Sequence, residues 1–241
     1  MKFEDAILTI KTFFLELLGF LIPGFFLLCL LTLCLSSNLQ TNLTNLIKVD
    51  YSNYIVLVIS YITGYFLYGL FELKKVIFSF LGKPAFLANL GIFVAQKVDF
   101  KLADEISKST EFKISYNLLI KHLNVSESDL PRANYRTIRS IMMSYLPEID
   151  NKIYTFMFRA DLSKNIATSL QLVGMLGIIS TMYGKWSQHD APFQNDYYFI
   201  ALYLIFVMIA LPLNKTYERF YGIAMRIIFS LFIAKFQPIV K

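Results

Sequence analysis

Four stretches of the chain are apolar over the length of a membrane-spanning helix. They cover residues 17–35, 54–73, 166–183 and 197–213. The first holds nineteen residues without a charge, and at a rise of 1.5 Å per residue it measures about 28 Å, close to the roughly 30 Å of a hydrocarbon core. The pattern predicts four transmembrane helices, paired as an N-terminal hairpin over 1–73 and a C-terminal hairpin over 166–213.

The more polar segment between the two hairpins, residues 74–165, predicts a helical insert. Helical periodicity marks 103–123 and 132–146 within it. A run without proline from Glu148 to Tyr183 predicts one continuous helix, because nothing in it interrupts the backbone hydrogen bonds. This helix begins in the insert and continues into the third span.

Two further apolar segments favour the membrane surface over a span. Residues 214–241 predict an amphipathic interfacial helix, separate from the fourth span, because a narrow polar stripe runs along an otherwise apolar face. The stripe consists of Lys215, Arg219, Gly222, Arg226 and Ser230. Residues 76–95 are apolar enough for an alternative topology with one more span, but Lys83-Pro84 near their middle favours a bend and a helix on the membrane surface.

Composition supports a lipid environment. Hydrophobic residues make up 56% of the 241 residues and charged residues 17%, against about 45–50% and 25% in soluble domains. Of the 23 lysines and arginines, only Lys48 and Lys185 fall in the loops 36–53 and 184–196. Because basic residues are retained on the cytoplasmic side, this asymmetry predicts a multi-pass membrane protein with the insert and both termini in the cytoplasm.

Catalytic and metal-binding patterns are missing from the sequence. The two cysteines, Cys29 and Cys34, lie in the first apolar stretch, and the predicted topology puts His122 and His189 on opposite sides of the membrane. No phosphate-binding glycine loop and no His-Glu-x-x-His motif is found. We therefore expect a protein that is not an enzyme and that holds no metal and no cofactor.

Small residues in the second and third spans indicate places where helix backbones can approach closely. They are Ser60, Gly64, Gly69, Gly174 and Gly177. Such residues serve either the contact between copies in a homo-oligomer or the packing of helices within one chain, and the sequence leaves both open.

The predicted 132–146 helix is amphipathic. Its apolar side carries Tyr135, Ile138, Met142 and Tyr145, and its basic side carries Arg132, Arg136 and Arg139. Guanidinium groups on one face can bind phosphate or carboxylate bidentately, so these arginines are candidates for binding a ligand or an acidic partner; a solvated helix face is the alternative. The insert has fourteen basic and nine acidic residues, an excess of 14 − 9 = 5 that does not predict direct nucleic-acid binding.

Several features together resemble small polytopic inner-membrane proteins of bacterial anti-phage defence systems, among them the transmembrane subunit of the Kiwa system. They are the run Leu18-Gly19-Phe20-Leu21-Ile22-Pro23-Gly24-Phe25, the glycines Gly64 and Gly69, and the stalk 154–162 with Arg159. The resemblance implies an oligomeric membrane component that works with a cytoplasmic effector.

Two classes of function therefore remain. In the first, the protein is a membrane anchor or sensor whose insert recruits or regulates a cytoplasmic protein. In the second, it is a pore-forming effector that permeabilises the inner membrane. The first predicts association with a soluble protein, and the second predicts flux from reconstituted liposomes.

Overall fold

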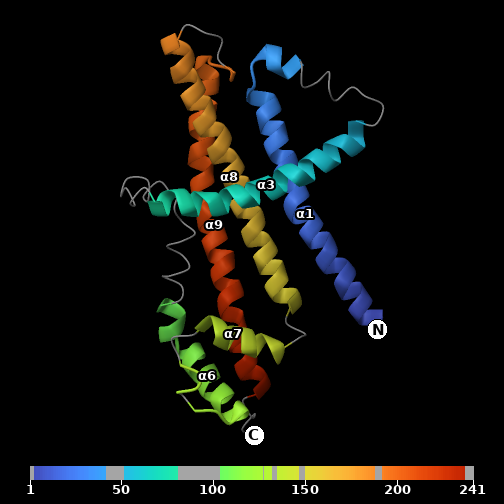
Figure 1. Ribbon diagram of the computed structural model, residues 1–241, viewed down its shortest axis with the longest axis vertical. Helices are drawn as coiled ribbons and strands as arrows, with labels where there is room; N and C mark the ends of the chain where they lie inside the picture. Colours follow the sequence, from blue (N-terminus) through green and yellow to red (C-terminus); the bar gives the residue numbers. More distant parts are fainter. Residues whose placement is uncertain are drawn as a thin grey trace. The chain divides into compact units, whose positions relative to one another are not determined.

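The computed structural model describes residues 3–41, 52–80, 104–126, 128–131, 135–146, 150–187 and 192–236 (Figure 1). Every named element in these ranges is an α-helix, as predicted. The helices are α1 (Phe3–Cys34), α3 (Ser52–Phe80), α6 (Thr110–Leu123), α7 (Tyr135–Ser144), α8 (Asp150–Ser187) and α9 (Tyr197–Phe236).

Four of these helices are long and apolar enough to cross a membrane. Their qualifying segments are Phe13–Cys34, Asn53–Leu70, Lys152–Gly184 and Tyr197–Phe236. Each overlaps one of the four predicted spans. The number and order of the apolar helices are therefore as the sequence predicts.

The chain divides into two compact units. Residues 1–93 and 160–217 form the first, called the span unit below, and residues 94–159 and 218–241 form the second, called the insert unit. The predicted insert, 74–165, falls mostly in the insert unit. The end of the chain, which was predicted to be a separate interfacial tail, is also part of that unit.

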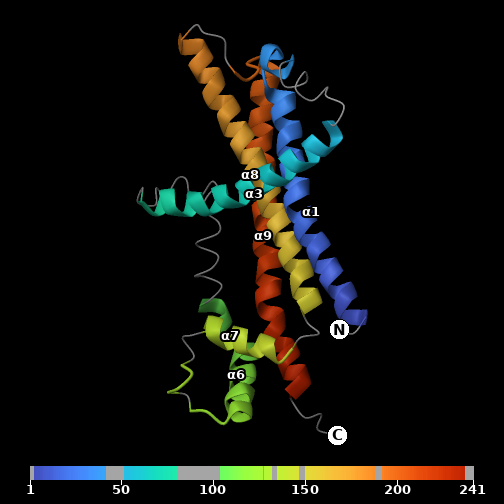
Figure 2. The ribbon, with the colours of Figure 1, turned by 45° about the vertical axis from the view of Figure 1, so that its right-hand side comes forward.

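The core of the span unit draws on all four apolar helices. α8 and α9 lie side by side in it, and α3 crosses α1 (Figures 1 and 2). The buried side chains are Leu27, Leu30, Cys34, Leu67, Ala167, Leu170, Val173, Phe193, Tyr203, Phe206 and Ala210. Many large side chains of α3 point outward instead, such as Tyr54, which is 72% exposed, and Tyr65, which is 63% exposed. Exposed apolar side chains of this kind suit a lipid-facing surface.

One end of the span unit is closed by hydrogen bonds between the end of α1 and the loop before α9. Leu35 and Phe193 form an isolated antiparallel bridge. The amide of Gln194 donates to the carbonyl of Cys34 at 2.9 Å. The buried Tyr203 hydroxyl donates to the Gln194 carbonyl at 2.8 Å and lies 3.3 Å from the Cys34 carbonyl. These bonds satisfy backbone groups that the end of α1 would otherwise leave unpaired.

The insert unit has its own apolar core, to which α6, α7, the start of α8 and the end of α9 contribute (Figure 2). Its buried members are Ile106, Phe112, Tyr116, Leu119, Leu130, Tyr135, Ile138, Met142, Leu146, Ile153, Ile228, Phe229 and Phe232. The Tyr116 hydroxyl donates to the Leu130 carbonyl at 2.7 Å, which ties the turn after α6 to that helix. Ile138 and Met142 lie on the predicted apolar side of the 132–146 helix, which appears as α7.

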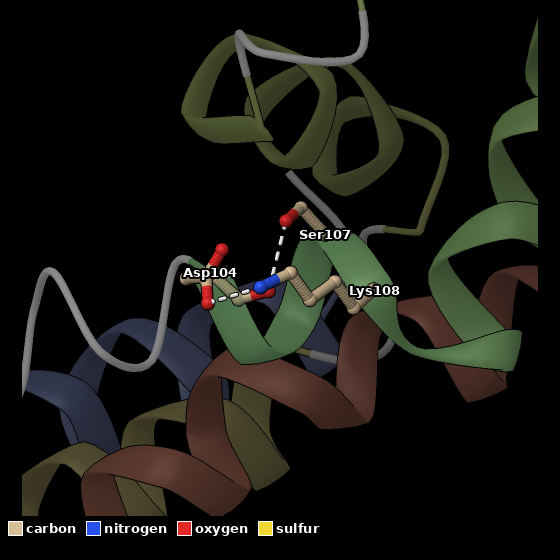
Figure 3. A network of polar contacts seen from close by, with 3 residues as sticks. All are labelled: Asp104, Ser107 and Lys108. Atoms are coloured by element: carbon tan, nitrogen blue, oxygen red, sulfur yellow. Dashed lines mark hydrogen bonds and ion pairs between the residues drawn. The ribbon is translucent and has the colours of Figure 1, made fainter.

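The predicted helix 103–123 is interrupted in the structure. A short helical turn, 104–108, comes first; in it the Lys108 ammonium donates to the Asp104 carboxylate at 2.6 Å and the Ser107 hydroxyl donates to the Asp104 carbonyl at 2.9 Å (Figure 3). Ser109 then adopts an extended conformation and accepts a hydrogen bond from the Phe112 amide. A serine N-cap satisfies one of the free amides of a new helix, so α6 begins after it.

The end of α9 differs from the prediction. We expected a fourth span ending at 213 and a separate helix over 214–241, but α9 continues without interruption to Phe236. Pro212 removes one backbone donor and does not end the helix. Beyond it, Ile228, Phe229 and Phe232 are buried in the insert-unit core, and this burial favours continuation of the helix over a separate surface helix.

The long helix predicted from Glu148 is confirmed in its extent, since α8 runs from Asp150 to Ser187. The prediction of a bend and surface helix over 76–95 lies mostly outside the described residues. Only 76–80 are described, and they continue α3.

Candidate functional site

A row of buried polar side chains runs along α8 in the span unit. Its members are Lys164, Asn165, Thr168, Ser169 and Gln171, each no more than 4% exposed. Polar groups inside an apolar bundle are costly unless they are paired, and ionisable ones are a common mark of function in membrane proteins. This row is therefore the strongest candidate site in the described part of the span unit.

Lys164 is the charged member of the row. Its ammonium lies 3.2 Å from the Asp161 carboxylate, one helical turn earlier, and 4.4 Å from the centre of the Tyr68 ring on α3. The Lys164 side chain is 5% exposed, whereas that of Asp161 is 40% exposed. The pair therefore links a buried cation to a carboxylate that water reaches, and the ring face adds a cation–π contact between α8 and α3.

The neighbours of Lys164 include a polar group with no partner. The hydroxyls of Thr168 and Ser169 donate to carbonyls of their own helix, those of Lys164 at 2.9 Å and Asn165 at 3.0 Å. The side-chain oxygen of Asn165 is buried and has no hydrogen-bond partner. The site thus presents a buried cation and an unused acceptor, a combination suited to holding or responding to charge.

Lys164 and Asn165 were not predicted to belong to this row, because the third span was predicted to start at residue 166, just after them. A signal was present: Lys164, Thr168 and Gln171 are spaced four and three residues apart, so they share one face of a helix. In an apolar segment, such a polar face indicates that it faces protein and not lipid.

The three arginines singled out from the sequence are only partly described. Arg132 and the side chain of Arg136 lie outside the described residues. Arg139, on α7, is half-buried rather than on a solvated face, and its Nε is buried without a hydrogen-bond partner. Burial lowers the pKa of Arg139, and the nearby Tyr221 and Tyr135 act in the opposite direction. Arg139 is therefore a partly buried residue of the insert unit and does not lie on a fully solvated helix face.

Arg139→Met is expected to leave the free energy of unfolding unchanged or to raise it by about 1 kcal/mol. The substitution removes a buried donor that has no partner and keeps an apolar side chain of similar length. Equilibrium unfolding of the purified protein in detergent measures the effect. A loss of more than about 1 kcal/mol would show that the guanidinium has a stabilising partner in the folded state.

The small residues of the second and third spans pack mostly inside one chain. A Cβ added at Gly174 would lie 2.8 Å from the carbonyl oxygen of Tyr203 on α9, and one added at Gly177 would lie 2.6 Å from the Tyr203 ring. Ser60 and Gly64 lie against α1, where a Cβ at Gly24 would be 2.6 Å from the Gly64 nitrogen. At Gly69 an added Cβ would meet no atom within 4 Å. Of these positions, only Gly69 is exposed in the single chain.

Comparison with known proteins gives no relative. No protein-family model, curated protein or solved structure matches this chain.

Metal chemistry has no visible site in the described ranges. Within them, no cluster of three or more His, Cys, Asp or Glu side chains is arranged to hold a metal ion. His122 lies on α6 with its ring 4.8 Å from that of Phe236 and 5.2 Å from that of Tyr145. These contacts assign the His122 ring to an aromatic cluster of the insert unit.

Proposed function

We propose that this protein is a non-enzymatic anchor or sensor of the bacterial inner membrane, with the insert unit and both termini in the cytoplasm, which assembles into a homo-oligomer and regulates a cytoplasmic effector. The resemblance noted above suggests anti-phage defence as the setting. Four apolar helices and the distribution of basic residues support the membrane location.

One observation carries the proposal: the same two helices help to build both cores. α8 places Ile153 in the insert-unit core and Val173 in the span-unit core. α9 places Phe206 in the span-unit core and Phe232 in the insert-unit core. Each unit is thus built on continuous helices that also belong to the other, as a signal-transmitting protein requires.

The lengths of these helices agree with such a role. α8 has 38 residues and α9 has 40, which at 1.5 Å per residue correspond to about 57 Å and 60 Å. A hydrocarbon core is only about 30 Å thick, so each helix has roughly half its length to spare outside it. Shifts of about 1–2 Å along packed helices are a known means of transmitting a signal.

The buried polar row offers a place where such a signal could begin. Lys164 sits on α8 and contacts Tyr68 on α3, so a change in its ion pair with Asp161 alters contacts between two helices of the span unit. α8 continues from Lys164 into the insert unit, which makes this helix the proposed path of such a signal.

Two measurements on the full chain test the proposal against pore formation. The tagged protein is co-expressed with the soluble proteins encoded beside it and purified in detergent, and the protein alone is reconstituted into dye-loaded liposomes. The proposal expects a stable complex with a soluble protein and no dye release beyond empty liposomes. Dye release without a complex would favour the pore-forming function over the anchor or sensor. If neither a complex nor dye release is observed, the proposed anchor or sensor function is rejected.

A charge-reversal experiment then tests whether arginines of the insert bind the soluble partner. Arg132→Glu combined with Arg136→Glu is expected to weaken the complex while leaving membrane insertion intact. Arg139 is left unchanged because it is half-buried, so a glutamate there would place a carboxylate partly inside the insert unit. Lys113→Glu combined with Lys121→Glu on α6 is the matched control, since both lysines are exposed and the charge change is equal. Equal weakening by the two pairs would show that general charge, and not the arginines, holds the partner.

A further inference from the structure

Of the lysine and arginine side chains that the structure describes, two are not exposed, Lys164 and Arg139. Lys164, in the span unit, has a counter-ion, the Asp161 carboxylate at 3.2 Å. Arg139, on α7 of the insert unit, has none: within the described ranges no hydrogen bond and no ion pair reaches its guanidinium. Tyr221 and Tyr135 act on it electrostatically, and neither is a carboxylate. Arg139 is therefore a partly desolvated cation without an anion beside it.

Arg139 lies at the edge of the buried face of α7. Ile138 and Met142 on that helix are fully buried, whereas Thr137 and Ser140 are exposed. The buried atom of the Arg139 guanidinium that has no partner is Nε. Its two terminal nitrogens are neither buried nor hydrogen-bonded to any described residue, so they are open to a group that approaches from outside the chain.

This arrangement costs the fold free energy. A charged group that loses part of its hydration must be compensated by an opposite charge or by hydrogen bonds, and Arg139 has neither within the described residues. For this reason Arg139→Met is expected to leave the protein as stable as before or more stable. A side chain that weakens its own fold is typical of a functional position, because a partner can supply what it lacks inside the chain.

A carboxylate is the anion that fits this guanidinium. Its two oxygens match the parallel N–H donors of one arginine, and its single negative charge balances the single positive charge. Partial burial reduces screening by water and salt, so such a pair is stronger than one on an open surface. Arginine and tyrosine are also enriched at the energetic centre of protein interfaces, and Tyr135 and Tyr221 lie near Arg139.

We propose that Arg139 binds a carboxylate side chain of the soluble effector. The inference rests on the cytoplasmic effector of the proposed function and adds the chemistry of its contact, an aspartate or glutamate side chain. The partner supplies in the complex what the single chain lacks, an anion at the terminal nitrogens of Arg139.

Fluorescence anisotropy of a labelled tetraglutamate peptide tests the site without the effector, on the purified full chain in non-ionic detergent. The peptide is expected to bind, and the corresponding tetraglutamine peptide is not. Arg139→Met should weaken binding at least about tenfold, in the range of hydrogen bonds to charged groups. Arg139→Lys should recover only part of the binding, because an ammonium keeps the charge and lacks the planar pair of donors.

Arg226→Met is the matched control. Arg226, also in the insert unit, is exposed and already paired with Glu105 at 2.7 Å, so the same substitution there should change peptide binding by less than about twofold. Equal losses in the two variants, or no binding of the tetraglutamate peptide, would overturn the site. Displacement of the peptide by inorganic phosphate, at concentrations at which acetate has no effect, would assign the site to a phosphate and overturn it as well.

The effector complex separates this inference from the proposed function. Arg139→Met should weaken the complex by a similar factor while the unfolding midpoint is unchanged or raised, which excludes misfolding as the cause. A complex that Arg139→Met leaves intact would overturn the inference and leave the proposed function standing. If no complex forms but Arg139→Met abolishes peptide binding, the proposed function is rejected and Arg139 remains a carboxylate-binding residue.

Discussion

Gly64→Ala is expected to lower the free energy of unfolding by about 3 kcal/mol, the upper end of the usual cost of overpacking a core. A Cβ at this position would lie 2.6 Å from the carbonyl carbon of Phe20 and 2.9 Å from its Cα. These are backbone atoms of α1. Relief therefore requires α1 and α3 to separate, because no single side chain can turn away to make room.

The separation would have further effects at the same crossing. The Phe20 ring packs against three tyrosines of α3, with centroid distances of 5.8 Å to Tyr61, 5.4 Å to Tyr65 and 6.1 Å to Tyr68. Aromatic pairs of this kind each contribute about 0.5–1.5 kcal/mol beyond the area they bury. Moving the helices apart weakens all three at once.

Gly69→Ala is the matched control on the same helix. Gly69 is exposed, and an added Cβ would meet no atom within 4 Å. Because alanine favours a helix over glycine by about 1 kcal/mol, this variant should be as stable as the parent protein or slightly more stable. Equilibrium unfolding in mixed detergent micelles, followed by circular dichroism, compares the two. Equal stability of both variants would contradict the close crossing of α1 and α3.

Lys164→Glu is expected to have the largest effect, a loss of about 3–5 kcal/mol, which is typical of an uncompensated buried charge. The new carboxylate would stand near Asp161, whose oxygen lies 3.2 Å from the present ammonium, and would face the Tyr68 ring. Like charges repel, and the face of an aromatic ring is electronegative. The yield of folded protein from the membrane fraction and its unfolding midpoint measure this loss.

Lys164→Met separates the charge from the packing. Methionine fills similar space without a charge, and apolar replacements of buried ionic groups are often neutral or stabilising, so a change within about 1 kcal/mol is expected. The exposed Lys152, also on α8, supplies the control: Lys152→Glu should change stability by less than about 0.5 kcal/mol. Lys164→Glu as stable as Lys152→Glu would show that residue 164 is not buried in the folded protein.

Lys164→Met also tests whether the charge of Lys164 has a function. If Lys164 takes part in transmitting a signal from the span unit to the insert unit, Lys164→Met should fold normally and still bind a soluble partner through the insert unit. It should, however, fail to regulate that partner. A folded Lys164→Met protein with full regulation would assign Lys164 to packing alone. The two results are distinguishable because folding and partner binding are measured separately.

Much of the helical layout was predictable because it depends on local properties. Long runs without charge or proline specify helices of membrane-spanning length, and the run from Glu148 predicted α8 nearly to its ends. The interruption at Ser109 also has a local cause, an N-cap serine. The apolar periodicity continues across that residue and therefore predicted a single helix over 103–123.

The course of α9 was not predictable in the same way. The polar residues after Leu213 resemble the stripe of a surface helix, and Pro212 indicates a break. Both signals are weak compared with the burial of Ile228, Phe229 and Phe232 against α6 and α7. That burial depends on helices far away in the sequence, so no local pattern could reveal it.

The candidate sites also combine features that the local sequence predicts with features that only the packing of distant helices decides. Residue spacing alone identified Gly64, Gly174 and Gly177 as places of close approach, because the lack of a side chain is a property of the residue itself. Which helix fills that space, and whether Lys164 and Arg139 end up inside or outside, depends on side chains brought together from distant helices. Burial is a property of the packed chain, so the sequence alone could not show that Lys164 is an interior group and Arg139 a half-buried one.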